Sequence, residues 1–64
     1  MSAPPPVFRP LRVMLVDDHP ERLALLDAAL TAAGHRIAAS LGTHEPLLAA
    51  VQRHRPDIVL IDVD

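Results

Sequence analysis

Two short apolar runs, each stopping at an aspartate, constrain the fold of this 64-residue chain most strongly. Residues 11–16 are followed directly by Asp17 and Asp18. Residues 58–61 are followed directly by Asp62. Short continuous apolar runs of this kind are typical of strands buried on both faces of a parallel sheet. The sequence therefore predicts two central strands whose ends carry carboxylates.

The segment after the first run has the start and stop signals of a helix. Pro20 suits the first helical position, and either Asp18 or His19 is suited to cap the helix. Glu21 is favoured near the positive end of the helix dipole. Gly34 occupies the position just past the helix end, where glycine is usual. The apolar stripe that we expect to face the sheet comprises Leu23, Leu26, Leu30 and Ala33.

Weaker signals fill the rest of the chain. Residues 35–40 predict an edge strand, because Ile37 is their only bulky apolar residue. We expect Thr43 to cap a second helix that runs to about His54, and Pro56 to stop it. The predicted buried face of this second helix comprises Leu47, Leu48 and Val51.

The order β-α-β-α-β predicts an α/β fold with a parallel sheet and right-handed crossovers. The first and third strands are the most apolar, and central strands are buried on both faces. The expected strand order is therefore 2-1-3. In that order the carboxyl ends of the first and third strands meet at a topological switch point, where open α/β sheets bind their ligands.

The aspartates after these two strands form a candidate site. A single acid at a strand end needs no ligand, because helix N-termini favour negative charge. Asp17 and Asp18 beside Asp62 would repel each other unless a cation or protons intervened. Hard oxygen ligands favour Mg²⁺, and a carboxylate beside such an ion is suited to attack phosphorus. Asp64 joins the same face as Asp62 only if the strand continues.

Composition excludes several other chemistries. All six basic residues are arginine, so the chain offers no lysine for a Schiff base or a phosphate loop, and it has no cysteine. The net charge of −2 is not that of a nucleic-acid-binding surface. The longest apolar run, residues 47–51, is too short to cross a membrane, and we expect a cytoplasmic protein. Residues 1–10 predict a disordered proline-rich leader, and residues 11–64 a single domain.

A known family combines these features. Residues 16–20, with their paired aspartates after an apolar strand, and residues 55–62, ending at Asp62, resemble the receiver (CheY-like) domain of two-component response regulators. The resemblance covers residues 11–64 and implies a truncated flavodoxin-like fold. It implies that Asp62 accepts a phosphoryl group from a sensor histidine kinase or another phosphodonor. It further implies that Asp17, Asp18 and Asp62 hold Mg²⁺ together with the main-chain carbonyl of Asp64.

A narrower resemblance concerns the output of such a receiver. Residues 20–22, 25–26, 29–30 and 61–64 look closest to the receivers of ANTAR-type transcription antiterminators. Antiterminators of this type resemble one another in that each uses a C-terminal RNA-binding domain. The resemblance implies transcription control by antitermination, with RNA contacted only by a domain absent from residues 1–64.

The chain also departs from the family. A complete receiver has five strands, with a switch hydroxyl after the fourth and a lysine after the fifth, whereas this sequence predicts three strands and contains no lysine. We therefore expect the N-terminal half of a receiver rather than an enzyme. An apolar third strand without an outer neighbour favours pairing with another chain, so we also expect self-association.

Two alternative functions remain open. The first is a pseudo-receiver, a protein-binding module controlled by a sensor protein partner rather than by phosphate. The second rests on residues 62–64, which resemble the Asp-x-Asp nucleophile motif of haloacid-dehalogenase-like phosphatases. In that family the motif normally closes the first strand, whereas here it follows the third.

Overall fold

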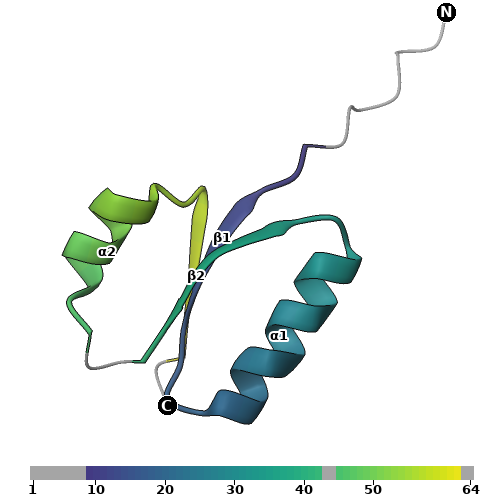
Figure 1. Ribbon diagram of the computed structural model, residues 1–64, viewed down its shortest axis with the longest axis horizontal. Helices are drawn as coiled ribbons and strands as arrows, with labels where there is room; N and C mark the ends of the chain where they lie inside the picture. The colour runs from purple at the N-terminus through teal and green to yellow at the C-terminus, as the bar shows by residue number, and fades with distance from the viewer. Residues whose placement is uncertain (1–8, 43–44, 63–64) are drawn as a thin grey trace, which may run out of the picture.

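The structure is a computed structural model that describes residues 9–42 and 45–62. The strands are β1 (Arg12–Val16), β2 (Arg36–Leu41) and β3 (Ile58–Ile61), and the helices are α1 (Pro20–Ala32) and α2 (Leu47–His54). The three strands form one parallel sheet in the order β2-β1-β3, as the sequence predicts. The two helices lie on opposite faces of the sheet (Figure 1). This arrangement is a truncated flavodoxin-like α/β fold.

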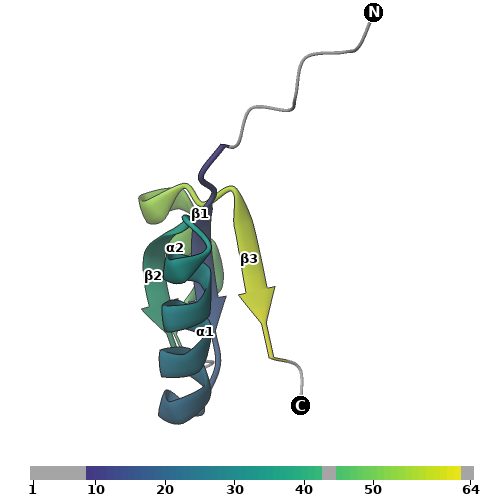
Figure 2. The same ribbon diagram turned by 90° about the vertical axis from the view of Figure 1, so that its right-hand side faces the viewer.

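The middle strand β1 forms the core of the molecule. Its neighbours β2 and β3 flank it on either side (Figure 2). Its four apolar residues from Val13 to Val16 are at most 6% exposed, because a strand lies on each side of them and a helix covers each face. Met14 and Val16 pack with Leu41 of β2 on the face that α2 covers. The prediction of a first strand buried on both faces is confirmed.

The helix α1 begins and ends close to its predicted positions. Pro20 is its first residue, and His19 is in the capping position, although no side-chain hydrogen bond caps the helix. Gly34 has a positive φ of 94° and donates its N–H to the Thr31 carbonyl, while the His35 N–H donates to the Leu30 carbonyl. These two bonds make a Schellman motif, which explains the glycine.

Part of the predicted apolar stripe of α1 is confirmed. Leu23, Leu26 and Leu30 are half-buried. The prediction for Ala33 is wrong, because the helix ends at Ala32 and Ala33 is exposed at its C-cap.

The helix α2 is shorter than the sequence predicts. It begins at Leu47 with Pro46 in the capping position, whereas Thr43 lies outside the described residues. Proline disfavours helical backbone in the residue before it, so Glu45 does not extend the helix towards its N-terminus. The helix ends at His54 as predicted, and Arg55 follows in left-handed backbone with φ 48°.

The predicted buried face of α2 is largely wrong. Leu47 is 38% exposed and Leu48 is 72% exposed. The residues that pack against the core are Ala50 and the half-buried Val51, so of the predicted face only Val51 is correct. A helix that starts at Leu47 has only about two turns, and the side of it that meets the core is the one that carries Ala50 and Val51.

The third strand β3 is at the edge of the described sheet. It pairs with β1 from Ile58 to Ile61, and no described strand pairs with its other side. Ile58, Leu60 and Ile61 are between 37% and 47% exposed. Within the described residues, no helix is long and apolar enough to span a membrane. Most of the predicted leader, residues 1–8, lies outside the described part, and Arg9 and Pro10 are exposed.

We predict that the apolar edge of β3 makes the 64-residue chain self-associate, since unpaired strand edges with exposed apolar side chains recruit further strands. Sedimentation velocity over a range of concentrations should show association. The Ile58→Lys variant places a charge on this edge and should shift the population towards monomer. The control Leu48→Lys changes an equally apolar, exposed residue on α2 and should associate like the wild type. A wild-type chain that stays monomeric at all concentrations would contradict the prediction.

Candidate functional site

The main chain brings Asp17 and Asp62 together at one end of the sheet. Val16 pairs with Ile61 in the last register position between β1 and β3, and an aspartate follows each of them. The Asp17 N–H donates to the Leu41 carbonyl of β2 at 3.0 Å, and the Asp62 N–H donates to the Val16 carbonyl at 3.0 Å. Both aspartates are therefore held by the final hydrogen bonds of the sheet.

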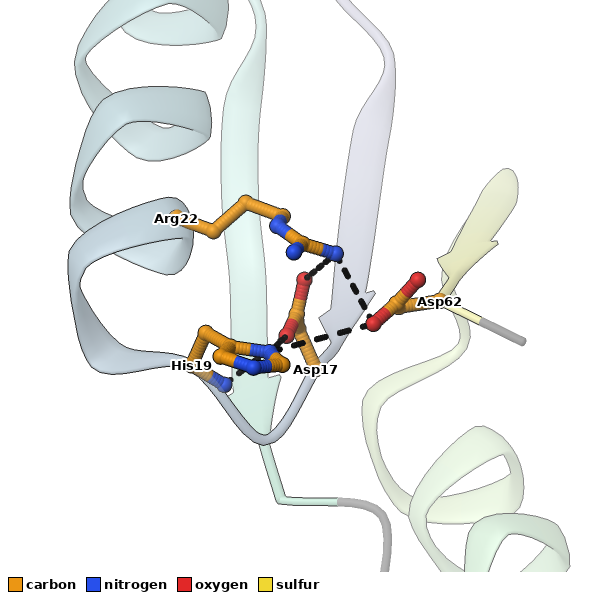
Figure 3. A network of polar contacts seen from close by, with 4 residues as sticks. All are labelled: Asp17, His19, Arg22 and Asp62. Carbon is orange, nitrogen blue, oxygen red and sulfur yellow. Dashed lines mark hydrogen bonds and ion pairs between the residues drawn. The ribbon is translucent and has the colours of Figure 1, made fainter. Parts of the chain in front are cut away.

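Arg22, in the first turn of α1, joins the two carboxylates. Its Nη1 lies 2.8 Å from Asp62 Oδ2 and 3.4 Å from Asp17 Oδ2 (Figure 3). Sequence reasoning gave Arg22 no role in the site. The available signal was its position two residues after Pro20, at the helix end that faces the aspartates.

His19 contacts the same carboxylates from the loop between β1 and α1. Its backbone N–H donates to Asp17 Oδ1 at 2.8 Å, and its ring Nδ1 lies 3.0 Å from the same oxygen. The ring Nδ1 is also 3.9 Å from Asp62 Oδ2. Two groups of His19 thus converge on one oxygen of Asp17 and leave the other oxygen to face Arg22 (Figure 3).

Asp17 and Asp62 differ in exposure and therefore in their chemistry. The Asp17 side chain is 3% exposed, whereas that of Asp62 is 22% exposed. Burial by itself raises the pKa of Asp17, but the hydrogen bonds from His19 and the nearby charges of Arg22 and His19 outweigh it and hold that pKa below its ordinary value of 3.8. Asp17 is thus a buried carboxylate that stays ionised, while the Asp62 oxygens are partly open to solvent.

The donor set at this site suits a metal ion. Asp17, His19 and Asp62 each offer a ligand atom, and these atoms lie within 4.8 Å of one another. Carboxylate oxygens fit Mg²⁺, which usually takes one or two carboxylates and keeps several waters, so the residues present fit the predicted ion.

The structure does not place the other two predicted ligands, Asp18 and Asp64, in this group. Asp18 is exposed and lies outside this group of three, among the residues that the structure describes. Its role as a ligand stays a prediction. Asp64 lies outside the described residues, so its carbonyl ligand and the Asp-x-Asp motif of residues 62–64 also stay predictions.

An open groove of about 480 Å³ runs from the carboxylates along the sheet between α1 and β3. Asp17, Arg22 and Asp62 line its polar end. The apolar residues that line it are Val16, Leu26, Val59, Leu60 and Ile61. The candidate site is therefore the charged end of an apolar groove.

One curated protein matches the whole chain. The protein-glutamate methylesterase/protein-glutamine glutaminase 1 of Paramagnetospirillum magneticum is 34% identical over 65 residues. This match supports the prediction that the chain is part of a receiver domain. The chain spans only 17% of the length of that methylesterase. No family model matches the chain, and no solved structure matches it significantly.

We predict that the ionised Asp17 carboxylate stabilises the fold and that this contribution disappears in acid. Its pKa in the folded chain lies below the unfolded value, so the stabilisation is present above about pH 4 and is lost as the pH falls through the folded-state pKa. Urea unfolding in EDTA should show Asp17→Asn to be less stable than the wild type at pH 7, with the difference shrinking towards pH 2.

The matched control for this comparison is Glu21→Gln, which removes an exposed carboxylate from the first turn of α1. Its stability difference from the wild type should change far less over the same pH range. A difference between the wild type and Asp17→Asn that stays constant from pH 7 to pH 2 would show that the Asp17 charge does not stabilise the fold.

Proposed function

We propose that this chain is the phospho-accepting half of a response-regulator receiver, in which Asp62 accepts a phosphoryl group. Mg²⁺ would be held by Asp17, Asp18 and Asp62, with the main-chain carbonyl of Asp64 as a further ligand. The phosphoryl donor would be a sensor histidine kinase or a small phosphodonor. The observation that carries the proposal is the pairing of a buried ionised carboxylate with a partly exposed one at the ends of β1 and β3.

The difference in exposure supports a division of roles between the two aspartates. Asp17 is enclosed, and His19 already occupies one of its oxygens, so it is suited to hold a cation and not to attack a substrate. Asp62 has the accessible oxygens, and it borders the groove. One Asp62 oxygen would form the new bond to phosphorus as the bond to the donor's leaving group breaks, and the leaving group would keep the electron pair. Mg²⁺, when bound, would neutralise the crowded negative charge of the carboxylates and the phosphoryl oxygens.

One observation favours the pseudo-receiver as a second candidate. The Arg22 guanidinium lies 2.8 Å from Asp62 Oδ2 and thus occupies one of the two oxygens that could attack phosphorus. If this contact were permanent, Asp62 would serve as a structural ion-pair partner. The chain would then bind a sensor protein partner without being phosphorylated.

Labelling with acetyl phosphate and Mg²⁺ separates these two functions. We expect intact mass spectrometry to show one added phosphoryl group on the wild type, which hydroxylamine should remove because an acyl phosphate is labile to it. Asp62→Asn should remain unmodified, and the control Asp57→Asn should be modified like the wild type. A wild-type chain that is never labelled, by acetyl phosphate or by a phosphorylated histidine kinase, would favour the pseudo-receiver.

The output that this receiver controls is a separate proposal. Its resemblance to ANTAR-type receivers favours transcription antitermination through an RNA-binding domain. The match to a methylesterase favours an enzymatic output instead. We propose antitermination, because it rests on several segments of the sequence.

The gene tests this proposal directly. Sequencing of the transcript beyond the codon for Asp64 should reveal codons for two further apolar runs that predict strands, a lysine after the second run, and a sequence that predicts a helical RNA-binding domain. A downstream esterase domain would overturn antitermination as the output and leave the receiver itself in place.

A further inference from the structure

We propose that Arg22 is a tethered cation that competes with Mg²⁺ for the carboxylates of Asp17 and Asp62. This inference rests on the proposed function, because it concerns the regulation of the same metal site. In the absence of a divalent ion, the guanidinium would close the site. Binding of the ion would require Arg22 to leave, so this residue would set the Mg²⁺ concentration at which the site fills.

Arg22 contacts both of the carboxylates that would hold the ion. Asp17 Oδ1 is taken by the N–H and the ring of His19, which leaves Oδ2 as its available oxygen. Arg22 Nη1 lies 3.4 Å from that oxygen and 2.8 Å from Asp62 Oδ2. The same nitrogen of Arg22 therefore lies beside an oxygen of each aspartate, and these oxygens would be less accessible to an ion while Arg22 stays there (Figure 3).

Charge gives the competition its strength. Two carboxylates attract a divalent ion strongly, and one arginine beside them cancels half of their formal charge. The guanidinium of arginine carries a positive charge, and its planar fork of N–H donors matches the geometry of a carboxylate. Its release restores the full attraction of the site for Mg²⁺, but only after the two arginine contacts have been broken.

Release of Arg22 is physically feasible. The Arg22 side chain is 45% exposed, so its guanidinium reaches water without crossing the core. Contacts of partly exposed ion pairs are weak compared with those of buried ones. The side chain starts in the first turn of α1, and the backbone hydrogen bonds of the helix do not involve the guanidinium. The contacts of Arg22 with the two carboxylates would therefore weaken ion binding and would still be able to break when an ion binds.

Isothermal titration of the full chain with MgCl₂ tests this inference. We expect Arg22→Gln to bind Mg²⁺ about tenfold more tightly than the wild type, the effect of losing one charge-assisted contact of moderate strength. Arg22→Lys keeps the charge and should bind close to the wild type. Arg36→Gln removes an exposed arginine from β2 and serves as the matched control with unchanged affinity. Amide NMR spectra of each variant should show a folded chain and Mg²⁺-dependent shifts near Asp17 and Asp62.

The results distinguish this inference from the proposed function. If the wild type binds Mg²⁺ and Arg22→Gln binds it no more tightly, the competition is overturned and the metal site stands. If Arg22→Lys tightens binding as much as Arg22→Gln, the effect does not come from charge, and the inference also fails. If no variant binds Mg²⁺, both the metal site and the competition fall. Asp62→Asn in the Arg22→Gln background should abolish the gain, because the gain requires the Asp62 carboxylate.

Discussion

The pairing of β1 with a strand on each side is the constraint on which the rest of the structure depends. Its apolar residues are buried because β2 and β3 flank it and a helix covers each face. The hydrogen bonds of this pairing continue one residue past the strands, where the Asp17 N–H reaches Leu41 and the Asp62 N–H reaches Val16. The ladder that builds the core thus also fixes the backbone of the two site aspartates. A change in the register of β3 by one residue would turn the Asp62 side chain to the opposite face of the sheet.

Much of this arrangement can be predicted from the sequence, because the boundaries of strands and helices depend on the types of residues near them. The two apolar runs, Pro20 at the start of α1 and Gly34 after its end are all located correctly, since each reflects a backbone preference of the residue itself. The strand order 2-1-3 also follows, because the two most apolar strands, β1 and β3, are predicted to be neighbours and the weakly apolar β2 to lie at an edge. The convergence of Asp17 and Asp62 is a consequence of that order and needs no further information.

The remaining features depend on contacts between distant segments, which local patterns do not encode. Leu48 has the apolarity of a core residue, but the position of α2 over the sheet exposes it and packs Ala50 and Val51 instead. Arg22 looks like any surface arginine in a first helical turn. Its role follows only from the position of that turn over the ends of β1 and β3, and from the 2.8 Å contact that results. His19 combines both cases, because its contact with Asp17 is local, two residues along the chain, whereas its approach to Asp62 depends on the fold.

The electrostatics of the site explain how one arginine can decide between its two candidate functions. Asp17 is held in place by its burial and by the hydrogen bonds of His19, and these hydrogen bonds, with the nearby charges of Arg22 and His19, keep its pKa low although burial alone would raise it. Asp62 is held less firmly, since its carboxylate is partly exposed and its closest charged partner among the described residues is Arg22. A divalent cation or a phosphodonor that reached the site would meet Arg22 at Asp62, whereas Asp17 is already held by His19. The Arg22–Asp62 ion pair is partly exposed to solvent, and an ion pair in that position is weaker than a buried one, so it is the contact of the site that costs least to break.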